Sequence, residues 1–262
     1  MLKQYTEKDL EQIGDVAYDR LKPEAITAFL WVTFAIGAGM AFFVSDTVSY
    51  SVNITNPIWS SIIQANIVLL VIHFIVCLFF SKKNFSYKFQ RLQSVVLCLV
   101  AIKFSFEFYP FYFLAVEDRF APGFMTTVGL LLLIGGAVYL LISTIRAIGR
   151  VKKGELKEDG QGLYHFKKSK TYISLPIIFG ATMLGGAIGQ ILSNSATTLG
   201  EMTGLFFILL LTVVIQYAVA MVWPEFFLLS YGKFRFESFR LKIPKTNNAQ
   251  KNIKTTGKKV KR

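Results

Sequence analysis

The stretch Gln93–Val116, QSVVLCLVAIKFSFEFYPFYFLAV, decides the fold that this sequence predicts. As a helix it would be about 36 Å long, which is enough to cross the roughly 30 Å hydrocarbon core of a bilayer. Two charged residues, Lys103 and Glu107, lie in its middle. An ionised side chain at that depth is costly unless it is paired or hydrated. Because residues four apart share one face of a helix, we expect Lys103 and Glu107 to pair with each other.

The rest of the chain repeats this apolar pattern, giving six blocks of about 20 residues, the length that spans a bilayer. The sequence therefore predicts an all-α polytopic membrane protein with six transmembrane helices. The expected spans are 25–44, 58–80, 93–116, 124–145, 172–192 and 205–230. They form one transmembrane domain over 23–230, between a short cytoplasmic amphipathic helix at 1–22 and a basic cytoplasmic tail at 231–262.

The basic residues predict the orientation of these spans. The chain carries 29 Lys and Arg against 16 Asp and Glu, a net charge of +13. In chain order, the segments outside the six spans hold 4, 0, 4, 1, 8, 0 and 11 of the basic residues. This alternation follows the positive-inside rule and predicts a protein of the cytoplasmic membrane with both termini in the cytoplasm. A basic surface facing anionic lipid headgroups accounts for the charge, so we expect a bilayer partner and no nucleic acid.

The N-terminal segment has an apolar stripe at helical spacing, formed by Leu10, Ile13, Ala17 and Leu21. The acids that cover the rest of its surface disfavour adsorption on anionic lipid. We expect this helix to dock on the basic loops of the same chain, with a partner surface as the alternative. At the other end, the tail beyond Pro244 is basic and poor in apolar residues, which predicts disorder.

Among the polar and charged residues of the predicted spans, we estimate the helix depth of six. They are Asn66, His73, Lys103, Glu107, Gln216 and Glu225. A rise of about 1.5 Å per residue places them roughly 7 to 20 Å from the cytoplasmic edge, so spans two, three and six could converge on one polar cluster. In one interpretation the charges neutralise each other and the amides join helices. In the other, the cluster lines an aqueous cavity and exchanges protons or contacts a polar solute.

Two prolines and a series of small residues predict further features of the spans. Pro110 removes a backbone donor near Glu107, and Pro224 does the same next to Glu225, so both helices could be kinked or broken as in transporters. The fifth span carries small residues four apart, Ala181, Gly185 and Gly189. This spacing predicts a close helix-packing seam.

Motifs for enzymatic chemistry are missing from the sequence. It contains no Gly-x-Ser-x-Gly, no His-Glu-x-x-His and no Walker loop. Cys77 and Cys98 lie in separate apolar blocks and have no metal-ligand spacing. We therefore expect no catalytic residues, no metal and no cofactor; Glu107 with Glu225 is a weak pair for a membrane-embedded enzyme.

The leading hypothesis from the sequence is a non-enzymatic membrane protein that acts through helix–helix contacts. Its partner would be another membrane protein or a second copy, and its role that of an accessory subunit or an immunity-type protein. The alternative is a small secondary transporter or proton-linked channel that uses the intramembrane Lys, Glu and His residues.

Overall fold

The computed structural model describes residues 5–163 and 198–243, and every regular element in these ranges is a helix. The elements are η1 (Glu7–Leu10), α1 (Glu11–Tyr18), α2 (Pro23–Tyr50), α3 (Ile58–Ser81), α4 (Lys83–Lys88), α5 (Gln90–Phe106), α6 (Tyr109–Asp118), α7 (Gly123–Lys152) and α9 (Thr198–Arg235).

Five helices in the described ranges are long and apolar enough to cross a membrane: α2, α3, α5 together with α6, α7, and α9. They correspond to five of the six expected spans. The remaining expected span, 172–192, lies outside the described residues, and so does the predicted seam of Ala181, Gly185 and Gly189.

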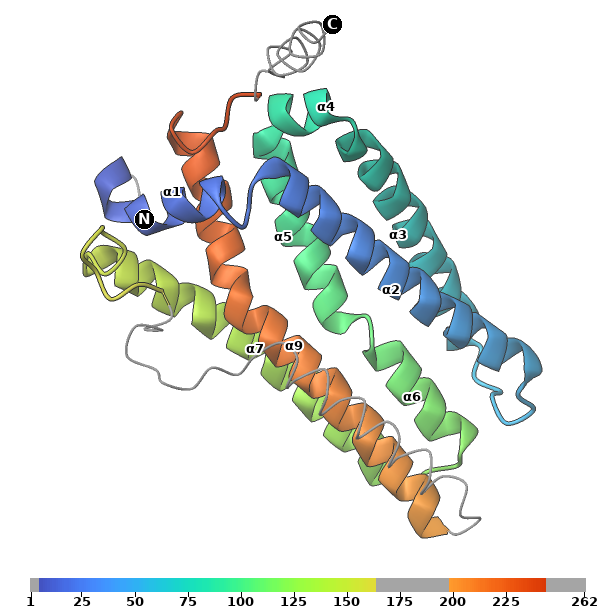
Figure 1. The fold of residues 1–262 in the computed structure, drawn as a ribbon. Helices are drawn as coiled ribbons and strands as arrows, with labels where there is room; N and C mark the ends of the chain where they lie inside the picture. The colour runs from blue at the N-terminus through green and yellow to red at the C-terminus, as the bar shows by residue number, and fades with distance from the viewer. Residues whose placement is uncertain (1–4, 164–197, 244–262) are drawn as a thin grey trace, which may run out of the picture.

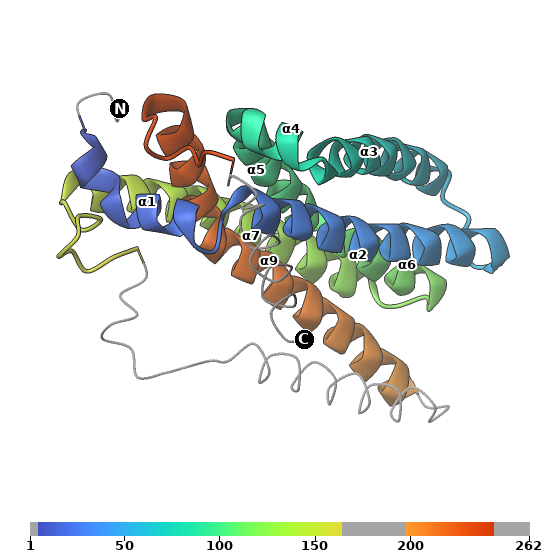
Figure 2. The same cartoon turned by 45° about the horizontal axis from the view of Figure 1, so that its top comes forward.

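The long helices pack in the order α3, α2, α5, α9 and α7 (Figures 1 and 2). Helix α2 contacts α3 on one side and α5 on the other, and α9 lies between α5 and α7. Helix α6 continues the direction of α5 and contacts α2, α7 and α9. Helices α3 and α7 therefore form the two edges of the arrangement, and only 11% of the apolar stretch of each is buried.

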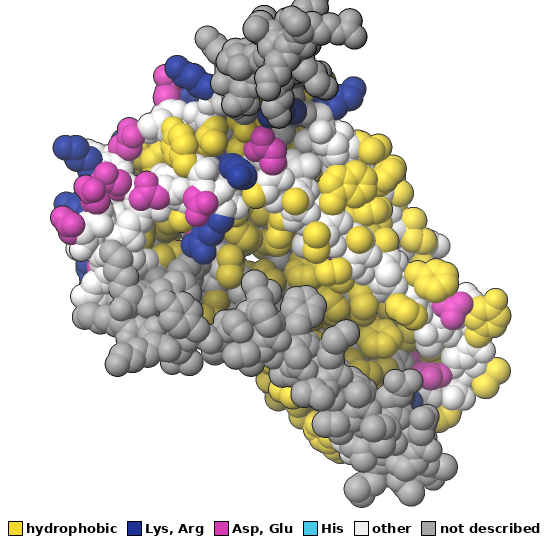
Figure 3. Space-filling model, in the orientation of Figure 1, with side chains coloured by type: hydrophobic (Ala, Val, Ile, Leu, Met, Phe, Trp, Pro, Cys, Tyr) yellow, Lys and Arg dark blue, Asp and Glu magenta, His cyan; other side chains and the backbone are white. Residues whose placement is uncertain are grey.

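Charged side chains gather at one end of the molecule, which we call the charged end: α1, α4, the turn after α7 and residues 236–243. Figure 3 shows this end with Lys, Arg, Asp and Glu side chains above a body covered by hydrophobic ones. The described parts of the basic segments that the positive-inside rule assigned to one side thus lie together. That this side is the cytoplasm stays a prediction.

Helix α1 docks on the protein itself. Its stripe is buried, with Leu10, Ile13 and Ala17 each at most 2% exposed within the largest core cluster. Next to the stripe, the Gln12 backbone N–H donates to the Leu156 carbonyl oxygen at 3.1 Å, and Asp9 lies 3.4 Å from Lys157 Nζ. The expected docking on the chain's own basic loop is therefore observed.

Helix ends extend beyond the apolar blocks. The block at 25–44 becomes a helix to Tyr50, and the backbone hydrogen bonds continue through its polar end: the Ser51 backbone N–H donates to the Thr47 carbonyl at 2.9 Å. Helix α9 likewise runs to Arg235, and Phe239 beyond it is only 2% exposed. Residues 231–243 thus pack on the helices, while the assignment of 231–262 as a cytoplasmic tail stays a prediction. Residues 244–262 lie outside the described ranges.

Candidate functional site

The third span is broken at its charged centre. Helix α5 ends at Phe106 and α6 begins at Tyr109, so Glu107 lies in the break. Pro110 lacks a backbone N–H and leaves the Phe106 carbonyl without its usual helical partner, which explains the location. The break expected from Pro110 is therefore present.

Glu107 is enclosed. Its Oε1 accepts an ion-paired hydrogen bond from Lys103 Nζ, one helical turn earlier. The Glu107 side chain is 2% exposed and that of Lys103 is 18% exposed. The second carboxylate oxygen, Glu107 Oε2, makes no hydrogen bond with the described residues. Solvent therefore does not reach the Glu107 side of the ion pair, and one carboxylate oxygen of Glu107 accepts no hydrogen bond from the described residues.

The wall against which Glu107 packs is the backbone of α2 at Gly37. A Cβ atom at position 37 would lie 2.8 Å from Glu107 Cδ and closer still to Oε1, so any larger residue there requires the Glu107 carboxylate to move. The sequence analysis did not predict this contact. The available signal was a glycine in the interior of an apolar span, which is typical of close helix approach.

Gln216 forms a separate polar contact between three helices. Its Oε1 accepts a hydrogen bond from the Tyr109 hydroxyl at 2.6 Å, and its Nε2 donates to the Leu133 carbonyl oxygen at 3.0 Å. The carboxamide lies against Gly136 of α7, where a Cβ would be 2.5 Å from Nε2. These bonds connect α9 to α6 and α7, so Gln216 acts as a clamp between helices.

The other expected cluster members also make separate contacts. Glu225, 3% exposed, accepts an ion-paired hydrogen bond from Arg20 in the α1–α2 linker at 2.5 Å. His73 packs edge-on against the Phe34 ring at 5.7 Å between centroids. Asn66 is half-buried on α3. The structure thus brings Lys103 and Glu107 together, with His73 near enough for the Lys103 charge to act on it electrostatically, but it does not bring all six residues into one cluster. Estimated depth says nothing about which way a side chain points around its helix.

A polar network at the charged end was missed by sequence reasoning. Gln93 Nε2 donates to the Pro23 carbonyl at 2.8 Å and to the hydroxyls of Thr27 and Ser86 at 3.0 Å. The signal was a glutamine at the first position of an expected span. These bonds connect the starts of α2 and α5 to α4 and fix the angle at which the two helices enter the membrane segment.

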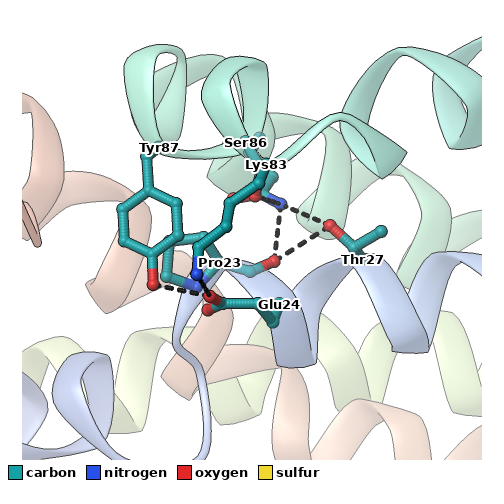
Figure 4. Close-up of polar contacts among 7 residues, drawn as sticks. Pro23, Glu24, Thr27, Lys83, Ser86 and Tyr87 are labelled. Atoms are coloured by element: carbon teal, nitrogen blue, oxygen red, sulfur yellow. Dashed lines mark hydrogen bonds and ion pairs between the residues drawn. The ribbon is translucent and has the colours of Figure 1, made fainter. Parts of the chain in front are cut away.

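The same junction holds a buried phenol. Figure 4 shows Tyr87 and Lys83 of α4 directed toward Glu24 at the start of α2. The Tyr87 hydroxyl donates to Glu24 Oε1 at 2.7 Å, and Lys83 Nζ lies 3.8 Å from that oxygen. Burial, together with the hydrogen bond to Glu24, raises the pKa of Tyr87 to about 12. Tyr87 therefore stays protonated and serves as a hydrogen-bond donor.

Residues 236–243 close the charged end. The Phe239 ring lies between Gly14 of α1 and Gly232 of α9, and a Cβ at Gly232 would approach it to 2.5 Å. The Gln90 carboxamide binds the backbone of Leu241 in both directions, donating at 2.6 Å and accepting at 3.1 Å. This segment thereby joins α1, α9 and the start of α5.

Two grooves lie on the surface of the described residues, and neither is lined by Lys103 or Glu107. One, of about 800 Å³, runs along the outer side of α1 and includes Glu7, Glu11 and Asp15 in its lining. The other, of about 690 Å³, lies between α3, α6 and α7 and is mostly apolar, with Tyr109 and Pro110 on its wall. The second adjoins the broken helix and opens where lipid would lie.

Comparison with protein families, with curated protein sequences and with the folds of solved structures found no match to this chain. Its function is therefore argued from its own residues.

Proposed function

We propose that the chain is a non-enzymatic, multi-pass protein of the cytoplasmic membrane that acts through helix–helix contacts with another membrane protein. In this proposal it is an accessory subunit or an immunity-type protein that protects against a membrane-active toxin. Both termini face the cytoplasm, and the basic charged end lies against anionic lipid headgroups.

The observation that carries this proposal is the enclosure of Glu107. A carboxylate that binds a solute or passes protons needs access to water, whereas the Glu107 side chain is 2% exposed, paired with Lys103 and packed against Gly37. Gln216 is likewise occupied by contacts between helices. These polar groups fix the helices relative to one another, and among the described spans the least buried are the edge helices α3 and α7.

The first test measures whether water reaches position 107. A cysteine at position 107, in a chain without Cys77 and Cys98, is treated in membranes with a small membrane-impermeant thiol reagent. We expect no labelling at 107, while a cysteine at Asn53, in the turn after α2, is labelled. Labelling at 107 in a folded protein would contradict the proposal.

The second test looks for the partner. The tagged chain is cross-linked in its native membrane and purified, and we expect one membrane protein in a fixed ratio to it. If the chain is recovered without a companion after efficient cross-linking, the proposal fails.

A second candidate function is a small secondary transporter or proton-linked channel. The observation that favours it is the break between α5 and α6 with an unused acceptor, Glu107 Oε2, since half-helices near the midplane are typical of transporters. In vesicles, Glu107→Gln should then abolish proton or solute flux, whereas Asn66→Ala should leave the flux unchanged. Unchanged flux in the Glu107→Gln protein would eliminate this candidate.

A further inference from the structure

One face of the edge helix α3 is not covered by the described helices. The side that packs on α2 includes Trp59, His73 and Cys77, which are at most 4% exposed. The opposite side carries residues that are all exposed, and these form what we call the α3 stripe: Gln64, Val68, Val71, Ile75 and Leu78. Their spacing of four, three, four and three residues is the heptad spacing of two helices that pack at a small angle.

Gln64 is the informative member of the α3 stripe. It lies about 9 Å from the start of α3, and because a helix of 24 residues is about 36 Å long, this is some 6 Å inside a 30 Å hydrocarbon layer. Gln64 is exposed, and no hydrogen bond joins its carboxamide to the described residues. A polar side chain in that position is stabilised by a hydrogen bond across a helix–helix contact. Lipid chains do not supply such a bond.

We infer that the α3 stripe packs in parallel against the α3 stripe of a second copy of this chain, with the two Gln64 carboxamides hydrogen-bonded to each other. Copies in one membrane share an orientation, so a two-fold axis along the membrane normal places each residue opposite itself at equal depth. A carboxamide both donates and accepts, and Gln64 therefore matches Gln64 of the second copy.

The remaining stripe residues fit the same arrangement. Val68 and Ile75 occupy one heptad position, and Val71 and Leu78 occupy the other. β-Branched residues at the first position favour two-stranded packing where leucine occupies the second, as Leu78 does, and Gln64 is the polar member of the stripe. The inference deepens the proposed function by naming one lateral contact and its occupant, and it leaves the α7 edge for a different partner.

Disulfide cross-linking of the full chain in membranes tests this contact. Single cysteines replace Val68, Val71 or Ile75 in a chain without Cys77 and Cys98, and an oxidant is added. The matched control is Leu69→Cys, since Leu69 is also exposed but lies about 140° around the helix from Gln64. We expect covalent dimers at the three stripe positions and none at 69. Dimers at neither set, or equal yields at both, would overturn the inference.

A second set of variants tests the amide pair. In the Val71→Cys chain, Gln64→Leu should lower the dimer yield about three- to tenfold, because a hydrogen bond between membrane helices is lost. Gln64→Asn keeps a carboxamide and should retain most of the dimer yield. Because residue 64 is exposed, neither change disturbs the fold of one copy. Equal yields for Leu and Asn would refute the amide pair.

Failure of this inference can be distinguished from failure of the proposed function. A photoreactive group attached at residue 71 that links to a different protein would overturn the second copy as occupant while supporting a heterologous partner. Conversely, loss of all stripe cross-links together with continued co-purification of another membrane protein would refute only the inference.

Discussion

The carboxylate of Glu107 lies directly against the backbone of Gly37. Because glycine has no side chain, α2 packs closely against the break in the third span. A charge pair, a helix break and a glycine on another helix thus form one structural unit in the middle of the protein. Its physical consequence is that a change of one methyl group at position 37 displaces a charged group.

Gly37→Ala should therefore destabilise the protein. The added Cβ would lie 2.8 Å from Glu107 Cδ, and overpacking of this kind costs about 1 to 3 kcal/mol. Gly39→Ala is the matched control, because a Cβ at position 39 meets nothing within 4 Å. Thermal unfolding in detergent should show a lower midpoint for Gly37→Ala only. Equal midpoints would mean that Glu107 does not lie against α2.

The Lys103–Glu107 pair should behave as one coupled unit. Glu107→Gln leaves Lys103 without its partner, and breaking a buried ion pair costs about 3 to 5 kcal/mol, less here because Lys103 is 18% exposed. The double variant Lys103→Met with Glu107→Gln should recover part of that loss. Denaturant unfolding of the four proteins in a double-mutant cycle measures the coupling. Additive effects would show that the two charges do not interact.

The attachment of the N-terminal segment should weaken in acid. Hydrogen bonds from the Thr6 backbone N–H and hydroxyl, at 2.8 and 2.9 Å, hold the pKa of Asp9 below its usual 3.8, with help from Lys157. Because the folded pKa is the lower one, the stabilisation is complete above pH 3.8 and is lost as the pH falls through the folded pKa.

Carbon NMR of the Asp9 carboxyl group measures this shift. We expect a titration midpoint below 3.8 in the intact chain and a return toward 3.8 in Thr6→Ala, which removes the hydroxyl donor. A midpoint that Thr6→Ala does not change would contradict the assigned cause.

The orientation of the charged end is open to a direct test. A reporter that is active only outside the cytoplasm should give signal when fused after Asn53 and none when fused after Lys157. The positive-inside rule predicts this pattern, because the loop after α7 is basic and the turn after α2 has no basic residue. The reverse pattern would invert the topology.

Local patterns predicted much of this architecture. Apolar block length located the five described spans, since hydrocarbon thickness imposes a minimum length on any helix that crosses it. Pro110 indicated the break, because a missing N–H acts within one turn. The helical spacing of Leu10, Ile13 and Ala17 correctly identified the docked face of α1. Helix ends were predicted less well, since the backbone hydrogen bonds of α2 continue to Tyr50, beyond its apolar block.

The candidate site was only partly predictable. Lys103 and Glu107 were paired correctly because they are four residues apart on one helix, so no tertiary information is needed. The partners of Gln216, Glu225 and Gln93 depend on the rotation of each helix about its axis, which an estimate of depth does not contain. Those pairings appear only when the helices pack.

By itself, the sequence determined that the chain forms long apolar helices and that the third helix breaks near Pro110. It also determined that the basic residues gather at one end. These features follow from short-range chemistry and from the free energy of transfer to lipid. Only the tertiary structure decided that Gly37 closes on Glu107, that Gln216 clamps three helices, and that Gln64 is left on an open edge. These depend on side-chain packing between segments far apart in the chain, where a single methyl group decides which helices can touch.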